Sequence, residues 1–464
     1  MSAPHELDVA IVGSGFAGSL LALIARRLGL RVALLERDRH PRFAIGESST
    51  PLANLLLEEL ASHYELPELL PFVKWGAWQR TRPDVGCGLK RGFSFYHHAL
   101  GQRWSANPAR SNELLVAASP RDEIADTHWY RADFDHALAK LAVQRGAELF
   151  EETVLRSIEW TATGAEIQAS TQSTPVTFRC RFVIDAGGPR GFLARAIPLH
   201  ETEFPSLPKT QALFSHFHGV SRWDELQPST ERPPYPVDDA ALHHVFDGGW
   251  IWILRFNNGV TSAGVAATDA LFSRLGIAEG RPGWERLMDQ LPSVREQFSA
   301  AQPCLPFRHL PRLAYRTSAA AGEYWALAPG AAGFIDPLLS SGFPLTLLGV
   351  QRLGRLLERD WNTDRWCSGL ASYESATMEE LDWTAGLIGA LYRNMANFET
   401  FVSLSLLYFA AASFSESARR LDRTDLADGF LLSRHPGFSA AYRRCIEMAT
   451  KSKSGIPRGS VAEE

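Results

Sequence analysis

The stretch that decides the fold is DVAIVGSGFAGSLLALIARRLGLRVALLER, residues 8–37. An apolar run predicts a strand over residues 7–12, and after a glycine-rich turn the apolar residues recur at helical spacing over residues 17–28. A second apolar run predicts another strand over residues 31–35, which Glu36 follows directly. Strand, turn, helix and strand in this order form a βαβ unit, so the chain opens with the first unit of a parallel sheet.

The turn has the spacing GxGxxG, which is typical of a dinucleotide-binding site. Gly13 permits the tight turn, Gly15 lets the backbone approach a pyrophosphate, and Gly18 lets the helix pack closely on the strand. The start of the helix beside Ala17 offers free N–H groups and a partial positive charge to phosphate. Glu36 can accept both hydroxyls of an adenosine ribose. A plain glycine-rich turn of an α/β protein is the alternative, but it would not require this acid.

The later segments predict a second sheet inserted into the cofactor domain. Helices are expected over residues 51–64, 131–146 and 344–358, a short buried strand over residues 182–186, and antiparallel strands between about residues 204 and 310. We therefore expect four parts. They are an FAD-binding domain over residues 1–200, completed by residues 310–360, a substrate-binding β-sheet domain over 201–310, a helical region over 361–450, and a disordered tail over 451–464.

Composition and charge exclude several classes of function. The 464 residues carry a net charge of -5, so no basic field would draw the protein to nucleic acid or to an acidic membrane surface. The five cysteines lie far apart without a CxxC pair, which disfavours a disulfide framework and a zinc site. The pairs His97–His98 and His243–His244 cannot each chelate a metal, because adjacent strand residues point to opposite faces. We expect no metal.

The same reasoning gives an expected location. The first residues lead directly into a strand, which leaves no room for an export signal, and the scattered cysteines fit a reducing cytoplasm. The most apolar later stretch, residues 401–414, is too short to cross a bilayer and is typical of a buried helix. We expect a cytoplasmic protein without a transmembrane span.

Three downstream segments resemble the second and third signatures of FAD-dependent monooxygenases and halogenases. They are RADFD from Arg131, IDAGG around Asp185, and GAAGFIDPLLSSG over residues 330–342. The resemblance implies FAD rather than NAD as the cofactor. Besides the glycine turn, it implies that the cofactor is contacted by Arg131, Asp185, Gly333 and Asp336.

Four pieces resemble the flavin-dependent halogenase family, in particular its branch acting on phenols, pyrroles and tryptophan. In chain order they are IGESSTP over residues 45–51, LKRGFSF over 89–95, GWIWIL over 249–254 and FIDPLLSSG over 334–342. The resemblance implies an α/β protein. Its Rossmann-like FAD-binding domain is of the aromatic hydroxylase/halogenase type, with an inserted antiparallel β-sheet substrate domain and a helical C-terminal region.

The resemblance also implies roles for single residues. Glu47 and Ser48 would lie beside the flavin, and Lys90 would hold or activate hypohalous acid, a task that suits an ammonium in a desolvated pocket. Trp250 and Trp252 would form a wall between flavin and substrate. The halide-side loop would contribute Pro337, Ser340, Ser341 and Gly342.

Each of these assignments has a simpler alternative. Lys90 can be a surface lysine on a strand, and the two tryptophans can pack a sheet core. Ser49 and Thr50 before Pro51 can cap a helix, and Ser340 and Ser341 can cap the next one.

The function expected is that of an FAD-dependent oxidoreductase that uses reduced flavin and O2 to halogenate or hydroxylate an electron-rich aromatic substrate. The substrate is free, carrier-bound or a protein side chain. Because no second GxGxxG is present, reduced flavin would come from a separate reductase. Two departures, Leu254 with Arg255 where the family has proline and Gly330 where it has aspartate, leave hydroxylation as open as halogenation. A reductase of the geranylgeranyl reductase type, or a flavin-binding accessory protein, would also fit the cofactor motifs.

Overall fold

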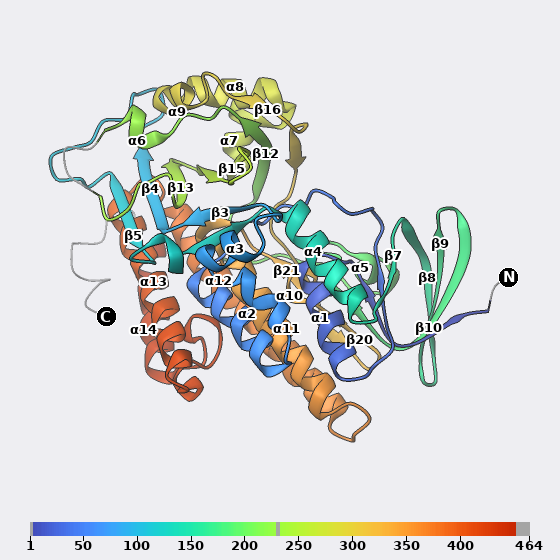
Figure 1. Cartoon of the computed structure of the whole chain (residues 1–464). Coiled ribbons are helices and arrows are strands. Elements are labelled where there is room, and N and C mark those ends of the chain that lie inside the picture. Colours follow the sequence, from blue (N-terminus) through green and yellow to red (C-terminus); the bar gives the residue numbers. More distant parts are fainter. Residues whose placement is uncertain (1–2, 229–232, 452–464) are drawn as a thin grey trace.

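The described residues form two eight-stranded sheets, one three-stranded and one two-stranded sheet, and a set of long helices packed beneath the two large sheets (Figure 1). The computed structural model describes residues 3–228 and 233–451. The tail expected to be disordered, residues 451–464, lies outside the described residues except for Lys451, which ends the last helix. The α/β fold class, with a Rossmann-like cofactor domain and a helical C-terminal region, is confirmed.

The first sheet contains the predicted βαβ unit. Its strand order is β19-β20-β10-β1-β2-β7, and β1 pairs in parallel with β10 on one side and β2 on the other. The expected strand over residues 182–186 is the end of a longer strand, because the first half of β10 forms an antiparallel hairpin with β9 that projects from the body (Figure 1). The strands are β1 (His5–Val12), β2 (Val32–Leu35), β7 (Glu148–Phe150), β8 (Thr153–Thr161), β9 (Gly164–Thr171), β10 (Thr174–Asp185), β19 (Ala321–Gly322) and β20 (Trp325–Leu327).

Helices pack against this sheet and bring the cofactor motifs together. The four helices predicted from apolar spacing are α1 (Phe16–Arg27), α2 (Pro51–His63), α4 (Arg131–Gln144) and α11 (Gly342–Arg359). Helix α1 contacts both α4 and α11. Because β1, β2 and β10 run in parallel, their carboxyl ends, and the motifs that follow them, meet at one edge of the sheet, where such folds bind ligands.

The second sheet corrects the expected domain boundaries. Its order is β16-β12-β15-β14-β13-β4-β5, so β4 and β5, within the range assigned to the cofactor domain, belong to the substrate sheet. It is also not wholly antiparallel, since β4 runs parallel to β13. The strands are β4 (Gly92–His98), β5 (Glu113–Ala117), β12 (Thr210–His218), β13 (Ala241–Phe246), β14 (Gly249–Arg255), β15 (Thr261–Thr268), β16 (Gln302–Pro303) and β17 (Arg308–Leu310).

A short ribbon connects the two sheets. Strand β3 (Cys87–Lys90) pairs antiparallel with β6 (Asp126–Trp129), and the chain leaves β3 at Lys90 to enter β4 two residues later. The sequence could not place this crossing, because the two strands have the same apolar character and only Arg91 stands between them. Lys90 therefore lies where the cofactor domain meets the substrate sheet.

Three long helices form the C-terminal region: α12 (Trp366–Arg393), α13 (Phe398–Arg420) and α14 (Pro436–Lys451). The expectation that the apolar stretch at residues 401–414 is too short for a membrane span is wrong as to length. The stretch lies in a helix of 23 residues that is long and apolar enough by length and composition, although 44% of its most apolar window is buried inside the protein. In the fold α13 packs on α2, α12 and α14.

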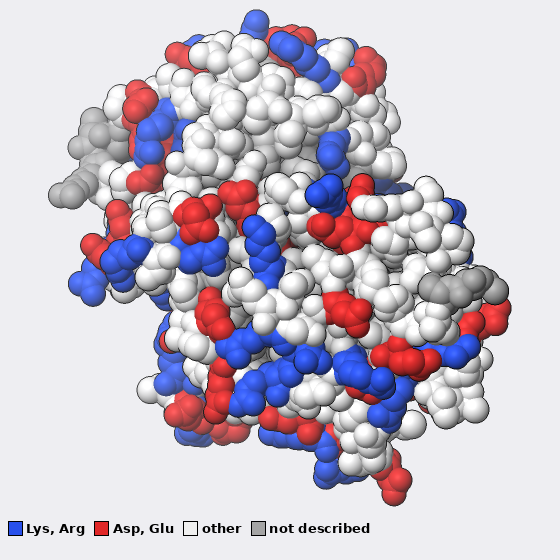
Figure 2. Space-filling view, turned by 45° about the vertical axis from the view of Figure 1, so that its right-hand side comes forward, with Lys and Arg blue, Asp and Glu red and all other residues white. Residues whose placement is uncertain are grey.

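Shorter elements complete the chain. On the face shown in Figure 2, Lys and Arg lie among Asp and Glu, with wide uncharged areas between them. The remaining elements are α3 (Trp75–Thr81), α5 (Phe192–Ala196), α6 (Trp223–Leu226), α7 (Asp269–Leu275), α8 (Arg281–Asp289), α9 (Pro292–Gln297), α10 (Pro329–Ala332), β11 (Glu201–Thr202), β18 (Tyr315–Thr317) and β21 (Gly333–Phe334), with 3-10 turns η1 (Pro67–Phe72), η2 (Asp122–Ile124), η3 (Ile277–Glu279), η4 (Leu338–Ser340), η5 (Thr424–Leu426) and η6 (Phe430–Leu432).

Candidate active site

The glycine turn has the geometry that its spacing predicts. Gly13 adopts φ +87°, which an L side chain rarely tolerates, and a Cβ on Gly18 would lie 2.0 Å from the carbonyl oxygen of Gly13. Gly15 caps α1 without a side-chain hydrogen bond, so no side chain occupies the free N–H groups of the first turn, in which Ala17 is buried. The helix start can therefore bind phosphate.

Glu36 and an arginine that the sequence did not single out lie above this turn. The carboxylate of Glu36 accepts hydrogen bonds from Ser14 N at 3.0 Å and from Arg42 Nη2 at 2.8 Å. Burial opposes ionisation of Glu36, but Arg42 and the Ser14 backbone outweigh it and lower its pKa to about 2. Arg42 Nε is buried and has no partner among the described residues. A guanidinium donor without a partner beside the glycine turn is suited to binding the pyrophosphate of a dinucleotide.

Two other predicted cofactor residues hold loops in place. Arg131 donates to the carboxylate of Asp135 through Nε at 2.7 Å and through Nη2 at 2.8 Å. Its Nη1 donates to the carbonyl oxygen of Gly46 at 2.8 Å. Asp185 accepts from the backbone N–H groups of Gly187 and Leu193, each at 2.8 Å. Both side chains are already bound in this structure, so they position the loops around the cofactor site. Direct contact of either one with FAD stays a prediction.

Lys90 is buried at the junction of three segments. Its side chain has 0% exposure, which excludes the surface lysine considered from the sequence. The Nζ atom donates to Ser48 Oγ at 2.8 Å, to the carbonyl oxygen of Ser49 at 2.6 Å and to Ser340 Oγ at 3.4 Å. It also lies 3.8 Å from the centroid of the Phe93 ring. The structure thus brings three of the predicted motifs together around one ammonium group.

The groups around Lys90 set its charge. Burial lowers the pKa of Lys90 to about 7, and the opposite charge of Asp126 limits the decrease. Asp126 faces Lys90 across the β3–β6 ribbon and binds Asn54 Nδ2 at 2.8 Å. Burial lowers the pKa of His243 to about 3 and that of His128 well below its usual range, and the Lys90 charge adds to both effects. Burial also raises the pKa of Asp126, against the opposing charges of Lys74 and Lys90, so the ionisation of Lys90 and that of Asp126 depend on each other.

Glu47 of the predicted flavin turn pairs with a histidine of the second sheet. Its Oε1 lies 2.8 Å from His216 Nε2 on β12, and both side chains are buried. Glu47 Oε2 and His216 Nδ1 are buried without partners among the described residues. The pair therefore joins the two domains and leaves one acceptor and one ring nitrogen for a further group at the cofactor site.

The tryptophan wall is tied to the halide-side loop. Trp250 and Trp252 lie on one face of β14 with ring centroids 5.7 Å apart. Trp250 Nε1 donates to the Tyr392 hydroxyl at 3.1 Å, which in turn donates to Asp336 Oδ2 at 2.8 Å. Burial raises the pKa of Asp336 to about 7, although hydrogen bonds from Leu338 and Tyr392 oppose the shift. Packing in a sheet core is therefore only part of the role of Trp250.

The halide-side loop has an unusual backbone. Leu339 and Ser340 adopt φ +63° and +56°, a left-handed conformation that costs non-glycine residues about 1–2 kcal/mol each. Pro337 precedes these two residues in the turn η4. Ser341 stands at the start of α11 but makes no capping hydrogen bond, and a Cβ on Gly342 would meet open space. The loop conformation directs Ser340 toward Lys90, whereas the expected capping role is fulfilled only by Thr50, which accepts from Ala53 N at 3.2 Å.

The side chain of Arg255 and the backbone of Gly333 make their hydrogen bonds with residues other than Lys90. Arg255 points to the other end of its strand, where Nε donates to Asp238 at 3.0 Å and Nη1 to the Val220 carbonyl oxygen. Gly333 has an extended backbone and begins β21, where it pairs with β18. The guanidinium of Arg255 therefore makes no hydrogen bond with Lys90.

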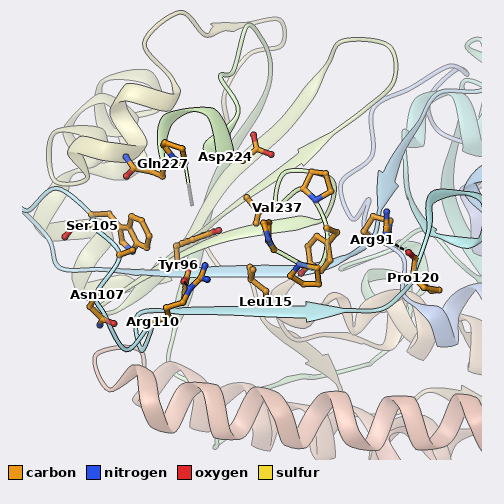
Figure 3. A pocket seen from close by; sticks show the side chains of 18 of the residues that line it. Arg91, Tyr96, Ser105, Asn107, Arg110, Leu115, Pro120, Asp224, Gln227 and Val237 are labelled. Carbon is orange, nitrogen blue, oxygen red and sulfur yellow. Dashed lines mark hydrogen bonds and ion pairs between the residues drawn. The ribbon is translucent and has the colours of Figure 1, made fainter. Parts of the chain in front are cut away.

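Two hollows lie on opposite faces of β4 and β5. One, of about 100 Å³, is bordered by Phe93, on which Lys90 stacks. The other, of about 1310 Å³, is lined by Tyr96 and Arg91 and lies between β5 and the segment containing Asp224 (Figure 3). Because alternate strand residues face opposite sides, β4 separates the larger hollow from Lys90. The smaller hollow therefore lies on the side of β4 that carries Phe93, the residue it shares with the surroundings of Lys90.

The described residues contain no group of three or more metal-ligating side chains. The histidine pairs do split between faces, as predicted. His98 Nε2 lies 2.9 Å from His244 Nδ1 on one face, and His97 stacks on Phe398.

Comparisons with known proteins agree with the assignment of an FAD-binding domain. A family model described as FAD dependent oxidoreductase matches residues 8–336. The chain is 28% identical over 421 residues to the tetracycline 7-halogenase of Kitasatospora aureofaciens, covering 87% of this chain and 73% of that protein. It is 28% identical over 401 residues to the monodechloroaminopyrrolnitrin halogenase PrnC of Pseudomonas fluorescens, covering 85% of this chain and 69% of that one.

A solved structure has the same fold. The crystal structure of halogenase PltM in complex with phloroglucinol and FAD superposes with a TM-score of 0.85 at 24% identity, covering 98% of this chain and 93% of that one. The resemblance to flavin-dependent halogenases deduced from the four motifs is thereby confirmed, as is FAD as the cofactor of the family.

Proposed function

The chain belongs to the family of FAD-dependent oxidoreductases, and on that premise we propose that it halogenates an electron-rich aromatic ring with reduced FAD and O2. The observation that carries the proposal is the placement of the Lys90 ammonium, which is fully buried and bound by Ser48 and Ser340. An ammonium held between the flavin-side turn and the halide-side loop can donate to the oxygen of hypohalous acid and make that oxygen a better leaving group.

When bound and reduced, FAD supplies the electrons with which O2 is activated. In the overall reaction O2 accepts two electrons from the flavin and two from the halide, the oxidised halogen replaces a ring proton, and both oxygen atoms leave as water. The glycine turn and Arg42 would bind the cofactor. Trp250 and Trp252 would keep the ring away from the flavin, so that the halogen is transferred at Lys90 instead of oxygen at the flavin.

The partners follow from the same scheme. The substrate is a flat aromatic molecule, in keeping with the halogenase names of the relatives. We propose a separate reductase as the source of reduced flavin, since the sequence has one GxGxxG motif, and we propose that the protein works in the cytoplasm. Whether the ring is free or carried by another protein depends on access to the cavity beside Phe93.

The test supplies reduced FAD, O2 and bromide together with a panel of indoles, phenols and pyrroles. Mass spectrometry should find products with added bromine. Replacing Lys90 by Ala should abolish bromination while FAD binding and O2 consumption continue. Lys209→Met is the matched control, because that lysine lies on the surface beside Glu203. Products with added oxygen alone would identify a hydroxylase, and turnover without O2 would identify a reductase.

A further inference from the structure

The cavity of about 100 Å³ bordered by Phe93 has walls from both domains and from the C-terminal helices. Phe93 of β4 forms the side nearest Lys90, whose ammonium stacks on the same ring. The facing side is helix α13, where Tyr408, Ala412 and Glu416 follow one another at four-residue spacing. Phe409 of the same helix lies 4.9 Å from Phe93 between ring centroids. Helix α13 thus forms the wall that faces Phe93.

The size of this cavity limits the ligand. An apolar cavity of about 150 Å³ can hold a single benzene ring, so a cavity of about 100 Å³ requires small side-chain adjustments even for one ring. Two fused rings would require Phe93 or Phe409 to move, and Phe93 is buried beneath the Lys90 ammonium. The walls therefore favour a ligand with one ring.

Tyr408 differs from the other buried tyrosines of the helical region. The hydroxyl groups of Tyr373, Tyr392 and Tyr442 donate to Leu327 O, to Asp336 and to Trp383 O respectively. The Tyr408 side chain is 3% exposed, yet within residues 3–228 and 233–451 its hydroxyl makes no hydrogen bond. The Tyr408 side chain lines the cavity.

A buried phenol hydroxyl normally has a partner. We propose that Tyr408 selects and orients the substrate, and that its hydroxyl pairs with the hydroxyl of a one-ring phenol held between Phe93 and α13. The expected effect on turnover rests on the proposed function. The expected binding of phenol to the cavity does not depend on the proposed function. The hydroxyl of the ligand would fix the orientation of the ring in the cavity, so Tyr408 is a specificity-determining residue that does not take part in the halogen transfer.

The test uses Tyr408→Phe, which removes one oxygen atom and keeps the ring. Phenol and toluene, which has a methyl group in place of the hydroxyl, are titrated into the FAD-loaded protein and observed by ligand NMR. The wild type should bind phenol about tenfold more tightly than toluene, the typical effect of one hydrogen bond. Tyr408→Phe should bind both alike. Tyr442→Phe, which loses a hydrogen bond away from the cavity, is the matched control and should keep the preference.

Turnover separates this inference from the proposed function. With bromide and O2, Tyr408→Phe should raise KM for phenol about tenfold with a smaller change in kcat, and it should broaden the ring positions that are brominated. If phenol preference depends on Tyr408 but no bromination occurs, the inference stands and the proposed function is wrong. If the wild type brominates phenol and Tyr408→Phe retains the preference for phenol over toluene, the inference is overturned.

Discussion

The pKa of Lys90 gives a quantitative prediction for the pH dependence of bromination. The pKa is lowered to about 7 by burial, against the opposing charge of Asp126. Only the ammonium form can donate to the oxygen of hypohalous acid, and with this pKa about nine tenths of Lys90 is protonated at pH 6 and about one tenth at pH 8. We therefore expect kcat/KM for bromination of phenol to fall about tenfold from pH 6 to pH 8, while O2 consumption changes little.

Two variants assign this pH dependence to Lys90. Asp126→Asn removes the negative charge that favours the ammonium, so the midpoint should move to lower pH. Lys90→Arg keeps a permanent cation, so any activity that remains should lose the dependence. Asp336, whose pKa burial raises to about 7, also titrates in this range. If the Lys90 ammonium sets the pH dependence, Asp336→Asn should nevertheless leave the midpoint in place.

The assay measures brominated phenol by liquid chromatography at saturating reduced flavin, with bound FAD checked by absorbance at each pH. A flat profile between pH 6 and pH 8 would refute the role given to the ammonium. If the midpoint is the same in Asp126→Asn as in the wild type but is lost in Asp336→Asn, the group that sets the pH dependence is Asp336 of the halide-side loop.

Three further predictions concern the cofactor site and the wall. Arg42→Met should weaken FAD binding about 10–100-fold, because a buried donor over the glycine turn is lost, and Arg42→Lys should restore part of the affinity. Flavin fluorescence titration measures the FAD affinity of both variants. If Arg42→Met binds FAD as tightly as the wild type, Arg42 does not contribute to FAD binding. Gly18→Ala places a Cβ 2.0 Å from the oxygen of Gly13, so the protein should purify colourless and melt at a lower temperature. A yellow, equally stable variant would contradict that geometry. Tyr392→Phe should lower the free energy of unfolding by about 1–3 kcal/mol, since a buried carboxyl and Trp250 both lose their partner. Urea denaturation measures the change, and product formed per O2 consumed should fall as well. An unchanged ratio of product to O2 consumed would show that Trp250 does not need its hydrogen bond to Tyr392.

The sequence by itself determined the features that depend on neighbouring residues. The tight turn at Gly13 and the close contact at Gly18 are backbone requirements that only glycine meets, so their spacing identified the cofactor domain and its βαβ unit. Apolar periodicity placed α1, α4 and α11 to within a few residues, because the buried face of a helix recurs every three to four positions.

Only the tertiary structure decided which distant side chains meet. Arg42, His216 and Tyr392 are single residues in a loop, a strand and a helix, and nothing around them in the sequence marks them as members of a site. Tyr408 lies in a helix whose composition indicates a core or even a membrane segment. The contacts of His216, Tyr392 and Tyr408 join segments more than fifty residues apart, and such packing has no local periodic pattern.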